Sequence, residues 1–274
     1  MLVNKAFDPE EATIIIKDFI KTYVENSGCS GVVIGLSGGI DSAVAALLCQ
    51  QAIGEKRTLC VFLPDDVTPN MDRKHLELIV KSFKINCKTR DITKIVSDIC
   101  NALIISADSM ALANIKARLR MMLLFEYANM ANSLVCGTTN KSEYLVGYYT
   151  KYGDGGVDIM PIGDLYKSQL IEVARYLKLP DEIIKKPPTA GLIKDQTDEE
   201  ELKISYKKLD QILYGLELKM EPLHIAQAVG STLKEVNRVQ NLRIKSQHKR
   251  RTPLIPKIGI RTPGLDWRSP IQTG

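Results

Sequence analysis

Short apolar runs alternate with longer amphipathic stretches along the first 180 residues of the chain. The short runs predict strands, and the stretches whose apolar positions recur at helical spacing predict helices. The predicted strands cover residues 31–36, 58–63, 85–89 and 133–137, with a short strand or extended segment at 157–161. The predicted helices cover residues 9–26, 40–53, a segment from about 70, 91–104, 108–130 and 167–178. Strands separated by helices indicate a doubly wound, mostly parallel α/β sheet.

The pattern changes near residue 180. Pro187-Pro188 and the acidic stretch DQTDEEE (195–201) are followed by helical spacing alone, and no internal repeat or low-complexity tract is present. We therefore expect a single domain over residues 1–274, with an α/β core at about 1–180 and a helical C-terminal extension at about 181–274.

The composition, 45% hydrophobic and 25% charged, is that of an ordinary globular protein. The net charge of +5 suits an anionic small molecule as well as weak attraction to nucleic acid, so it excludes neither. Six cysteines without a C-x-x-C pair favour buried free thiols in a reducing cytoplasm over disulfides or zinc. Because no export signal and no apolar run of about 18 residues is present, we expect a cytoplasmic protein without a membrane segment.

A glycine-rich octamer, GLSGGIDS at residues 35–42, connects the apolar run at 32–34 to a predicted helix. A strand, a glycine-rich turn and a helix in this order commonly hold phosphate, because backbone N–H groups and the positive end of the helix dipole face the anion. The Walker turn requires a lysine where Ile40 and Asp41 stand, and the dinucleotide fingerprint requires a glycine spacing that this turn lacks. The remaining pattern is S-G-G-x-D-S.

Asp41 is the unusual member of this pattern, because a carboxylate next to polyphosphate is repulsive unless a cation lies between them. Mg²⁺ would provide that cation. Gly38 and Gly39 would let the backbone approach the phosphate, and Ser37 and Ser42 would add hydroxyl donors. The alternative is a plain helix start in which Asp41 is only a capping group.

The octamer resembles the pyrophosphate loop of the ATP pyrophosphatases, also called adenine nucleotide α hydrolase-like enzymes. The resemblance implies a Rossmann-like fold and cleavage of ATP between its α and β phosphates, with adenylation of an oxygen on a second substrate. The loop residues that it implies in ATP binding are Gly35, Leu36, Ser37, Gly38, Gly39, Ile40, Asp41 and Ser42. The octamer leaves the second substrate open.

Four further motifs indicate which second substrate the chain uses. The segments NIKARLRM (114–121), GTTNKSEYLVGYYTKYGDGGVDIMPIGDLYK (137–167), KPPTAGL (186–192) and SQHKRRTP (246–253) together resemble the NAD synthetase family. The resemblance extends over nearly the whole chain. It implies an ATP-dependent ligase that converts nicotinic acid adenine dinucleotide (deamido-NAD⁺) and ammonia to NAD⁺, with AMP and pyrophosphate as the other products.

The resemblance adds four residues to the ATP site. Thr138 ends a predicted strand at the edge where open α/β sheets bind ligands. Glu143, on the following short helix, would hold Mg²⁺ together with Asp41, and a solvated helix charge is its plain alternative. Lys167 starts a helix, where positive charge is unfavourable unless an anion is near, and the resemblance makes that anion an ATP phosphate. Thr189 matches the second ATP-contacting threonine of the family.

The resemblance also implies a set of residues that bind deamido-NAD⁺. These residues are Arg118, Lys151, Asp158, His248 and Lys249. Arginine suits phosphate or carboxylate through paired hydrogen bonds, and Asp158 can accept from ribose hydroxyls. Because Arg118 and Arg120 lie two positions apart on a predicted helix, they project in different directions. We assign Arg118 to the ligand and leave Arg120 as a salt-bridge or surface residue.

The implied reaction has two steps: an acyl-adenylate forms with release of pyrophosphate, and ammonia then displaces AMP. Asp154, in YGDGG (152–156), is the candidate catalytic residue that binds and deprotonates ammonium, and an ordinary Asp-Gly turn is its alternative. Glutamine-using members of the family carry an amidase domain for which this chain has no room, so we expect free ammonia as the nitrogen donor. The family also implies a homodimer, to which the Met- and Leu-rich helix at 109–130 would contribute.

Two other members of the superfamily remain as alternatives. The basic segment RIKSQHKRR (243–251) would suit an enzyme that acts on RNA, such as tRNA-lysidine synthetase, which shares the glycine-rich octamer. No interleaved aromatic residues accompany this segment for base stacking, so we expect no nucleic-acid partner. GMP synthetase is the second alternative, and the segment TKYGDGG (150–156) favours NAD synthetase over it.

Overall fold

The computed structural model describes residues 7–103, 110–188 and 197–263. Its centre is a parallel sheet of four strands in the order β3-β2-β1-β4, in which β1 pairs with both β2 and β4. The strands are β1 (Gly31–Gly35), β2 (Thr58–Phe62), β3 (Cys87–Thr89) and β4 (Ser133–Cys136). The predicted α/β class with a parallel sheet is confirmed. The segment at 157–161, predicted as a short strand or extended segment, is extended and has one parallel bridge, between Cys136 and Ile159.

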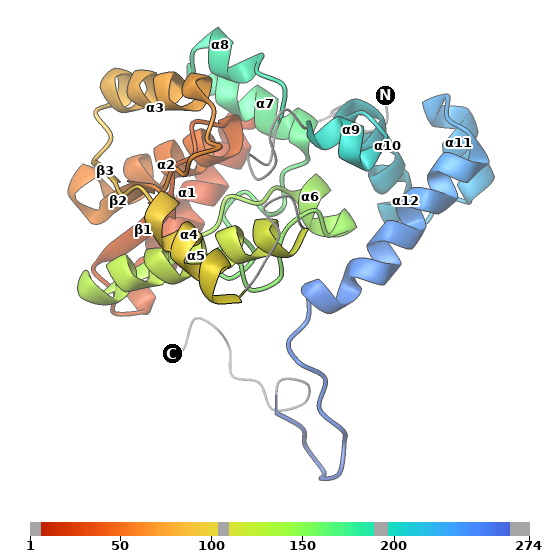
Figure 1. Cartoon of the computed structure of the whole chain (residues 1–274). Helices are drawn as coiled ribbons and strands as arrows, with labels where there is room; N and C mark the ends of the chain where they lie inside the picture. The colour runs from red at the N-terminus through yellow and green to blue at the C-terminus, as the bar shows by residue number, and fades with distance from the viewer. Residues whose placement is uncertain (1–6, 104–109, 189–196, 264–274) are drawn as a thin grey trace.

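Helices cover both faces of the sheet, as Figure 1 shows. The helices of the α/β part are α1 (Pro9–Asn26), α2 (Ile40–Ile53), α3 (Asn70–Phe83), α4 (Thr93–Leu103), α5 (Met110–Met130), α6 (Lys141–Val146) and α7 (Lys167–Tyr176), with a 3₁₀ turn at Glu55–Arg57. The pattern predicts each to within a few residues except α6, which it indicates only as a short helix around Glu143. Within the described ranges, no helix has the length and apolar character needed to cross a membrane.

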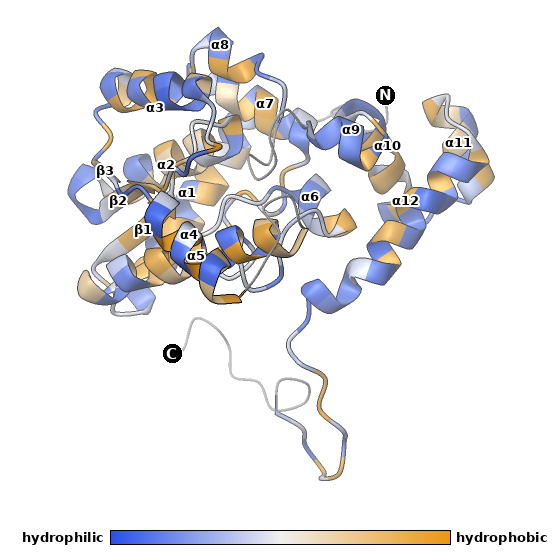
Figure 2. Cartoon of the chain, in the orientation of Figure 1, coloured by the Kyte–Doolittle hydropathy of each residue, from blue (hydrophilic) through white to orange (hydrophobic). Residues whose placement is uncertain are grey.

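The alternating side chains of β1 explain the layers. Val32 and Ile34 are buried against α1, α2 and α7 on one face, whereas Val33 is buried against α4 and α5 on the other. Because successive side chains of a strand point to opposite faces, an uninterrupted apolar run is what a strand covered on both sides requires. The hydropathy colouring of Figure 2 shows the apolar residues of these helices gathered toward the sheet.

The helices after residue 180 are α8 (Asp181–Ile184), α9 (Asp198–Leu202), α10 (Tyr206–Glu217), α11 (Pro222–Val229) and α12 (Leu233–Lys245), followed by a 3₁₀ turn at Ser246–Lys249. Helix α8 packs on the α/β part through buried Ile183, whereas α9 to α12 lie beside the sheet (Figure 1). Helices α9 to α12 share a second apolar core, which also includes Val146 of α6 and Tyr166. Residues 250–263 form no helix. The division near residue 180 stays a prediction.

Buried Asp210 of α10 joins this helical part to the α/β part. Its carboxylate accepts from Ser142 Oγ of α6 (2.5 Å) and from the backbone N–H of Ser168 in α7 (2.8 Å). Both α6 and α7 begin at the carboxyl-end side of the sheet and carry predicted site residues. The helical part therefore fixes the position of Glu143 and Lys167.

Candidate active site

The glycine-rich loop occupies the turn between β1 and α2, at the carboxyl end of the central strand. Gly38 has φ of +83°, and a Cβ at this residue would lie 2.4 Å from the backbone oxygen of Asp72 in α3. A left-handed φ is accessible to glycine and strained for other residues, and the close approach of α3 leaves no volume for a side chain. Both observations explain why the sequence has glycine here.

A substitution at Gly38 should therefore cost more stability than a substitution at a glycine with the same backbone strain and free space. Gly28 is that control, because it has φ of +70° and a Cβ added there would meet no atom within 4 Å. We expect Gly38→Ala to lower the free energy of unfolding by at least about 1 kcal/mol more than Gly28→Ala. Urea unfolding measures both values. Equal losses in the two variants would show that the contact with Asp72 is unimportant.

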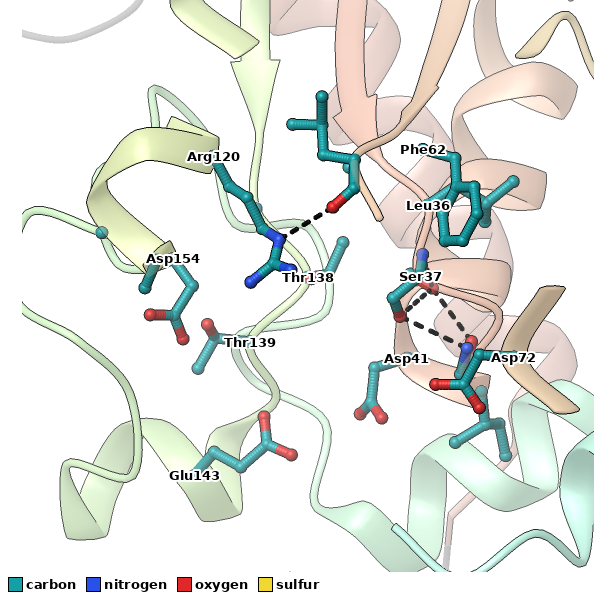
Figure 3. A pocket seen from close by; sticks show the side chains of 18 of the residues that line it. Leu36, Ser37, Asp41, Phe62, Asp72, Arg120, Thr138, Thr139, Glu143 and Asp154 are labelled. Atoms are coloured by element: carbon teal, nitrogen blue, oxygen red, sulfur yellow. Dashed lines mark hydrogen bonds between the residues drawn. The ribbon is translucent and has the colours of Figure 1, made fainter. Parts of the chain in front are cut away.

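The hydroxyls of Ser37 and Ser42 form hydrogen bonds within the loop. Ser37 Oγ lies 3.1 Å from Ser42 Oγ and accepts from the N–H of Gly39 (3.3 Å), while Ser42 Oγ donates to the carbonyl of Gly39 (3.0 Å). Figure 3 shows Ser37 within this network. The sequence pattern suggested hydroxyl donors for phosphate, whereas the structure gives the hydroxyls a role in holding the turn. Their ATP contact stays a prediction.

One cavity, of about 290 Å³, extends from this loop across the ends of β1, β2 and β4. Every predicted ATP-loop residue except Gly38 lines it, together with Thr138, Glu143 and Asp154. Figure 3 shows Asp41 on one side of the cavity, Asp154 on the other, and Thr138 and Glu143 between them. Lys167 reaches the cavity through its contacts with Asp41 and Glu143. Thr189 lies outside the described residues.

The Lys167 ammonium lies between two carboxylates. Its Nζ is 2.5 Å from Asp41 Oδ2 and 3.5 Å from Glu143 Oε1, and only 5% of the side chain is exposed. Asn140 completes the group, because its Nδ2 donates to Asp41 Oδ1 (2.8 Å). The same Asn140 caps α6: its Oδ1 accepts from the N–H of Glu143, and Glu143 Oε2 accepts from its N–H. The capping box of α6 thus orients Glu143 toward Asp41.

The pKa values of Glu143 and Lys167 are both raised, for different reasons. Burial, together with the neighbouring Asp41 carboxylate, raises the pKa of Glu143 above its ordinary value. Burial alone would lower the pKa of Lys167, but Asp41 and Glu143 outweigh it and raise that pKa above its ordinary value. Asp41 and Glu143 therefore share the single positive charge of Lys167. With both carboxylates ionised the group carries a net negative charge, which a further cation would neutralise.

A metal ion in the cavity would meet Asp41 and Glu143, the two carboxylates that contact Lys167. Among the described residues, no group of three or more Asp, Glu, His or Cys side chains converges to form a metal site. Mg²⁺ commonly uses one or two carboxylates and completes its shell with water and substrate phosphate oxygens. Asp41 and Glu143 next to a phosphate-type loop fit that pattern.

Asp154 lies at the other end of the cavity, in the glycine-rich turn at 150–156. One carboxylate oxygen accepts from the backbone N–H of Thr150 (2.8 Å), and the residue lines the cavity. The surrounding protein raises the pKa of this carboxyl through desolvation, against the lowering effect of the Thr150 hydrogen bond. Asp154 thus accepts a hydrogen bond within the turn and also lines the cavity, and its role as the base for ammonium stays a prediction.

The five predicted deamido-NAD⁺-binding residues do not line this cavity. Arg118 is exposed and its Nη2 donates to the carbonyl of Lys151 (3.4 Å). Asp158 Oδ2 accepts from the N–H of Val135 in β4 (2.7 Å), and Lys249 Nζ donates to the carbonyls of Gly147 and Tyr149 (2.6 Å each). His248 is exposed. The structure therefore brings Arg118 next to Lys151 but places the set outside the cavity, and its ligand stays a prediction.

Four charged residues that line the cavity are absent from the predicted site: Arg120, Asp198, Asp72 and Lys186. Asp198 is buried at the start of α9, within 3.2 Å of the hydroxyls of Tyr148 and Tyr206, whereas in the sequence it is only one residue of an acidic stretch. Asp72 and Lys186 form an ion pair with a distance of 2.5 Å. Arg120 does form the salt bridge considered for it, but it faces the cavity rather than the outer surface. Lys186 lies in the KPPTAGL motif and Arg120 in NIKARLRM, but the sequence does not show that either faces the cavity, and it gives no signal for Asp72 or Asp198.

Comparisons with known proteins agree on one family. The model of the NAD synthase family matches residues 13–253. The NH(3)-dependent NAD(+) synthetase of Methanosarcina acetivorans is 41% identical over 254 residues, which cover 92% of this chain and 99% of that relative. Two solved structures, each 33% identical, cover 92% of this chain and 100% of their own: the NMN synthetase from Francisella tularensis (TM-score 0.82) and the NH3-dependent NAD synthetase from Campylobacter jejuni in complex with nitrate (TM-score 0.77).

Proposed function

The chain belongs to the NAD synthase family and catalyses ammonia-dependent NAD⁺ synthesis, and we propose that it does so by adenylating the carboxylate of deamido-NAD⁺ with ATP. One observation carries this proposal: a single cavity joins the glycine-rich loop and the Asp41–Lys167–Glu143 group to Asp154. A phosphate-type loop and a separate carboxylate within one cavity are what a reaction with a phosphoryl step and an amine step requires.

The first step activates the acid. An oxygen of the nicotinate carboxylate bonds to the α-phosphorus of ATP, and the bond from that phosphorus to the bridging oxygen breaks with its electron pair leaving on pyrophosphate. Loop N–H groups and Lys167 would stabilise the charge on the phosphates, since Lys167 can exchange one of its carboxylate partners for a phosphate oxygen. Thr138, at the end of β4, would contact the adenylate moiety.

The second step forms the amide. The nitrogen of ammonia bonds to the acyl carbon, the tetrahedral adduct expels AMP, and the surplus nitrogen proton passes to a base. Asp154 is the carboxylate at that end of the cavity, where it can accept this proton. Positioning and charge neutralisation supply most of the catalysis in such a scheme.

Asp41 and Glu143 would hold Mg²⁺ when ATP is bound. The ion would neutralise the triphosphate and the departing pyrophosphate. Lys167 would then give up part of its contact with these carboxylates, which keeps the charge of the group balanced.

The dinucleotide site lies beyond the cavity in this proposal. Arg118, Lys151, Asp158, His248 and Lys249 would hold the adenylyl and ribosyl parts of deamido-NAD⁺ while the nicotinate end reaches the cavity. We propose that a second copy of the chain completes this site in a homodimer. Met110, Met122 and Met130 of α5 are exposed and would be available to such an interface.

A second acid substrate follows from one of the structural relatives, which is an NMN synthetase. Nicotinic acid mononucleotide carries the same nicotinate carboxylate and would give NMN by the same two steps. The test compares deamido-NAD⁺, nicotinic acid mononucleotide and xanthosine monophosphate in an assay of AMP formation from ATP. We expect the highest kcat/KM with deamido-NAD⁺. Preference for xanthosine monophosphate, or AMP formation that depends on RNA, would contradict the proposal.

Ammonia should be the nitrogen donor and the rate should follow its free base. At a fixed, limiting concentration of ammonium chloride, we expect NAD⁺ formation to rise between about pH 7 and about pH 9, because deprotonated ammonia is the nucleophile. Glutamine as sole donor should give almost no product. Product is measured by an NAD⁺-specific cycling assay, with ATP and deamido-NAD⁺ saturating. Robust glutamine-dependent turnover by the purified chain would contradict this prediction.

A further inference from the structure

Arg120 is an arginine fixed inside the cavity by its neighbours in the chain. Its Nε donates to the carbonyl of Leu63 (3.0 Å), just after β2, and its Nη2 lies 3.4 Å from Asp65 Oδ2. Only 23% of the side chain is exposed, and the residue lines the cavity. An arginine held in this way has lost most of its rotamer freedom, so its guanidinium is already placed for a ligand.

Asp65 does not use up the charge of Arg120. This fully buried carboxylate lies 2.8 Å from Lys116 Nζ and also accepts from Thr68 Oγ1 (2.8 Å). Lys116 is buried as well, and its other acidic neighbour, Asp66, is 3.8 Å away and 63% exposed. One buried carboxylate therefore serves two cations. The second carboxylate of this group, Asp66, is more distant and largely exposed, so Arg120 shares with Lys116 the one buried carboxylate that contacts it and is only partly neutralised.

Asp154 faces the same part of the cavity. Figure 3 shows the guanidinium of Arg120 and the carboxylate of Asp154 on the side away from Ser37 and Asp41, with Thr138 between the two sides. The two side chains interact electrostatically but are not in ion-pair contact. The space between them thus has a cationic wall and an anionic wall, opposite the loop that is proposed to bind phosphate.

We propose that Arg120 binds the carboxylate of the acid substrate and then stabilises the oxyanion that forms when ammonia attacks the acyl-adenylate. This inference rests on the proposed function and adds a residue to it. A guanidinium matches a carboxylate with two parallel N–H groups. After adenylation, one of the former carboxylate oxygens becomes the carbonyl oxygen. Attack by ammonia moves the carbonyl electron pair onto that oxygen, where Arg120 neutralises it until AMP leaves and the carbonyl re-forms.

The product offers a charge-specific test, because NAD⁺ differs from deamido-NAD⁺ by a carboxamide in place of the carboxylate. Calorimetry measures the Kd of each dinucleotide for wild type, Arg120→Met and Arg120→Lys, with Mg²⁺ and α,β-methylene-ATP present to prevent turnover. We expect Arg120→Met to lose at least about tenfold more affinity for deamido-NAD⁺ than for NAD⁺, since a charged hydrogen bond to the acid is removed. Arg120→Lys should restore part of the difference. Equal losses for acid and amide would overturn the proposal.

Turnover gives the second readout. Arg120→Met should lower kcat/KM for deamido-NAD⁺ about 100-fold, while the Kd for ATP changes less than about threefold. The matched control is Arg90→Met, because Arg90 is 38% exposed and pairs with Glu126 at the surface. If the wild type is active and Arg120→Met has the same kcat/KM, the role of Arg120 is overturned but the proposed function is not. A wild type that amidates neither deamido-NAD⁺ nor nicotinic acid mononucleotide would overturn the proposed function, and this inference with it.

Discussion

Asp41→Asn is expected to fold like the wild type and to lose about 100-fold or more in turnover. Asp41 is the loop carboxylate that contacts Lys167 and, in the proposed function, Mg²⁺. Asparagine keeps the shape and can still interact with Asn140, but it removes the negative charge that would hold the ion beside the triphosphate. Removing one group that stabilises transition-state charge commonly costs about 10²- to 10³-fold. Steady-state NAD⁺ formation, titrated with MgCl₂ to saturation, measures the loss.

Glu143→Gln tests whether the two carboxylates act together. If both hold one ion, the double variant Asp41→Asn/Glu143→Gln should lose much less than the product of the two single losses. Asp181→Asn is the control, because Asp181 is 74% exposed and pairs with Lys185 on the surface. Near-normal turnover of Asp41→Asn at saturating Mg²⁺ would contradict the metal role. Multiplicative losses would instead assign the carboxylates to separate tasks.

Most of the fold is predictable from the sequence because the signals are local. Gly39 and Ile40 mark the turn and the first residue of α2, and the run at 32–34 marks a strand covered on both faces. The segment at 157–161 is harder, because an apolar run specifies extended backbone but not how many strand partners it finds. In the structure it forms a single bridge to Cys136 before the chain continues to α7.

The sequence predicts only those site residues that belong to a recognisable motif. Helical geometry separates Arg118 from Arg120 by about 200°, so the sequence shows that they face differently but not which one faces the cavity. That depends on how α5 packs on the sheet, where the carbonyl of Leu63 and buried Asp65 receive Arg120. Asp198 and the Asp72–Lys186 pair likewise join the cavity through contacts between segments far apart in the chain. Long-range contacts of this kind leave no local pattern.

Asp154→Asn should separate the two halves of the reaction. Asp154 lies at the end of the cavity away from the loop, so its loss should spare the phosphoryl step and slow the amine step. In a rapid-quench experiment with ATP, deamido-NAD⁺ and ammonium chloride, we expect a first turnover of pyrophosphate near the wild-type rate. NAD⁺ formation should lag about 100-fold at about pH 7, which is the usual scale for loss of a general base. At about pH 9 the lag should shrink, because more of the ammonia is already deprotonated.

The substitution is suited to this test because it preserves the turn. An asparagine side-chain oxygen can still accept from the N–H of Thr150, so the backbone of the glycine-rich turn at 150–156 should keep its conformation. Thermal unfolding of the same sample checks this point, and Asp164→Asn is the control, since Asp164 is 94% exposed and contacts Lys141 at the surface. If pyrophosphate release falls as far as NAD⁺ formation while the melting temperature is unchanged, Asp154 acts in the first step. An equal loss at both pH values would likewise contradict its role as the base for ammonium.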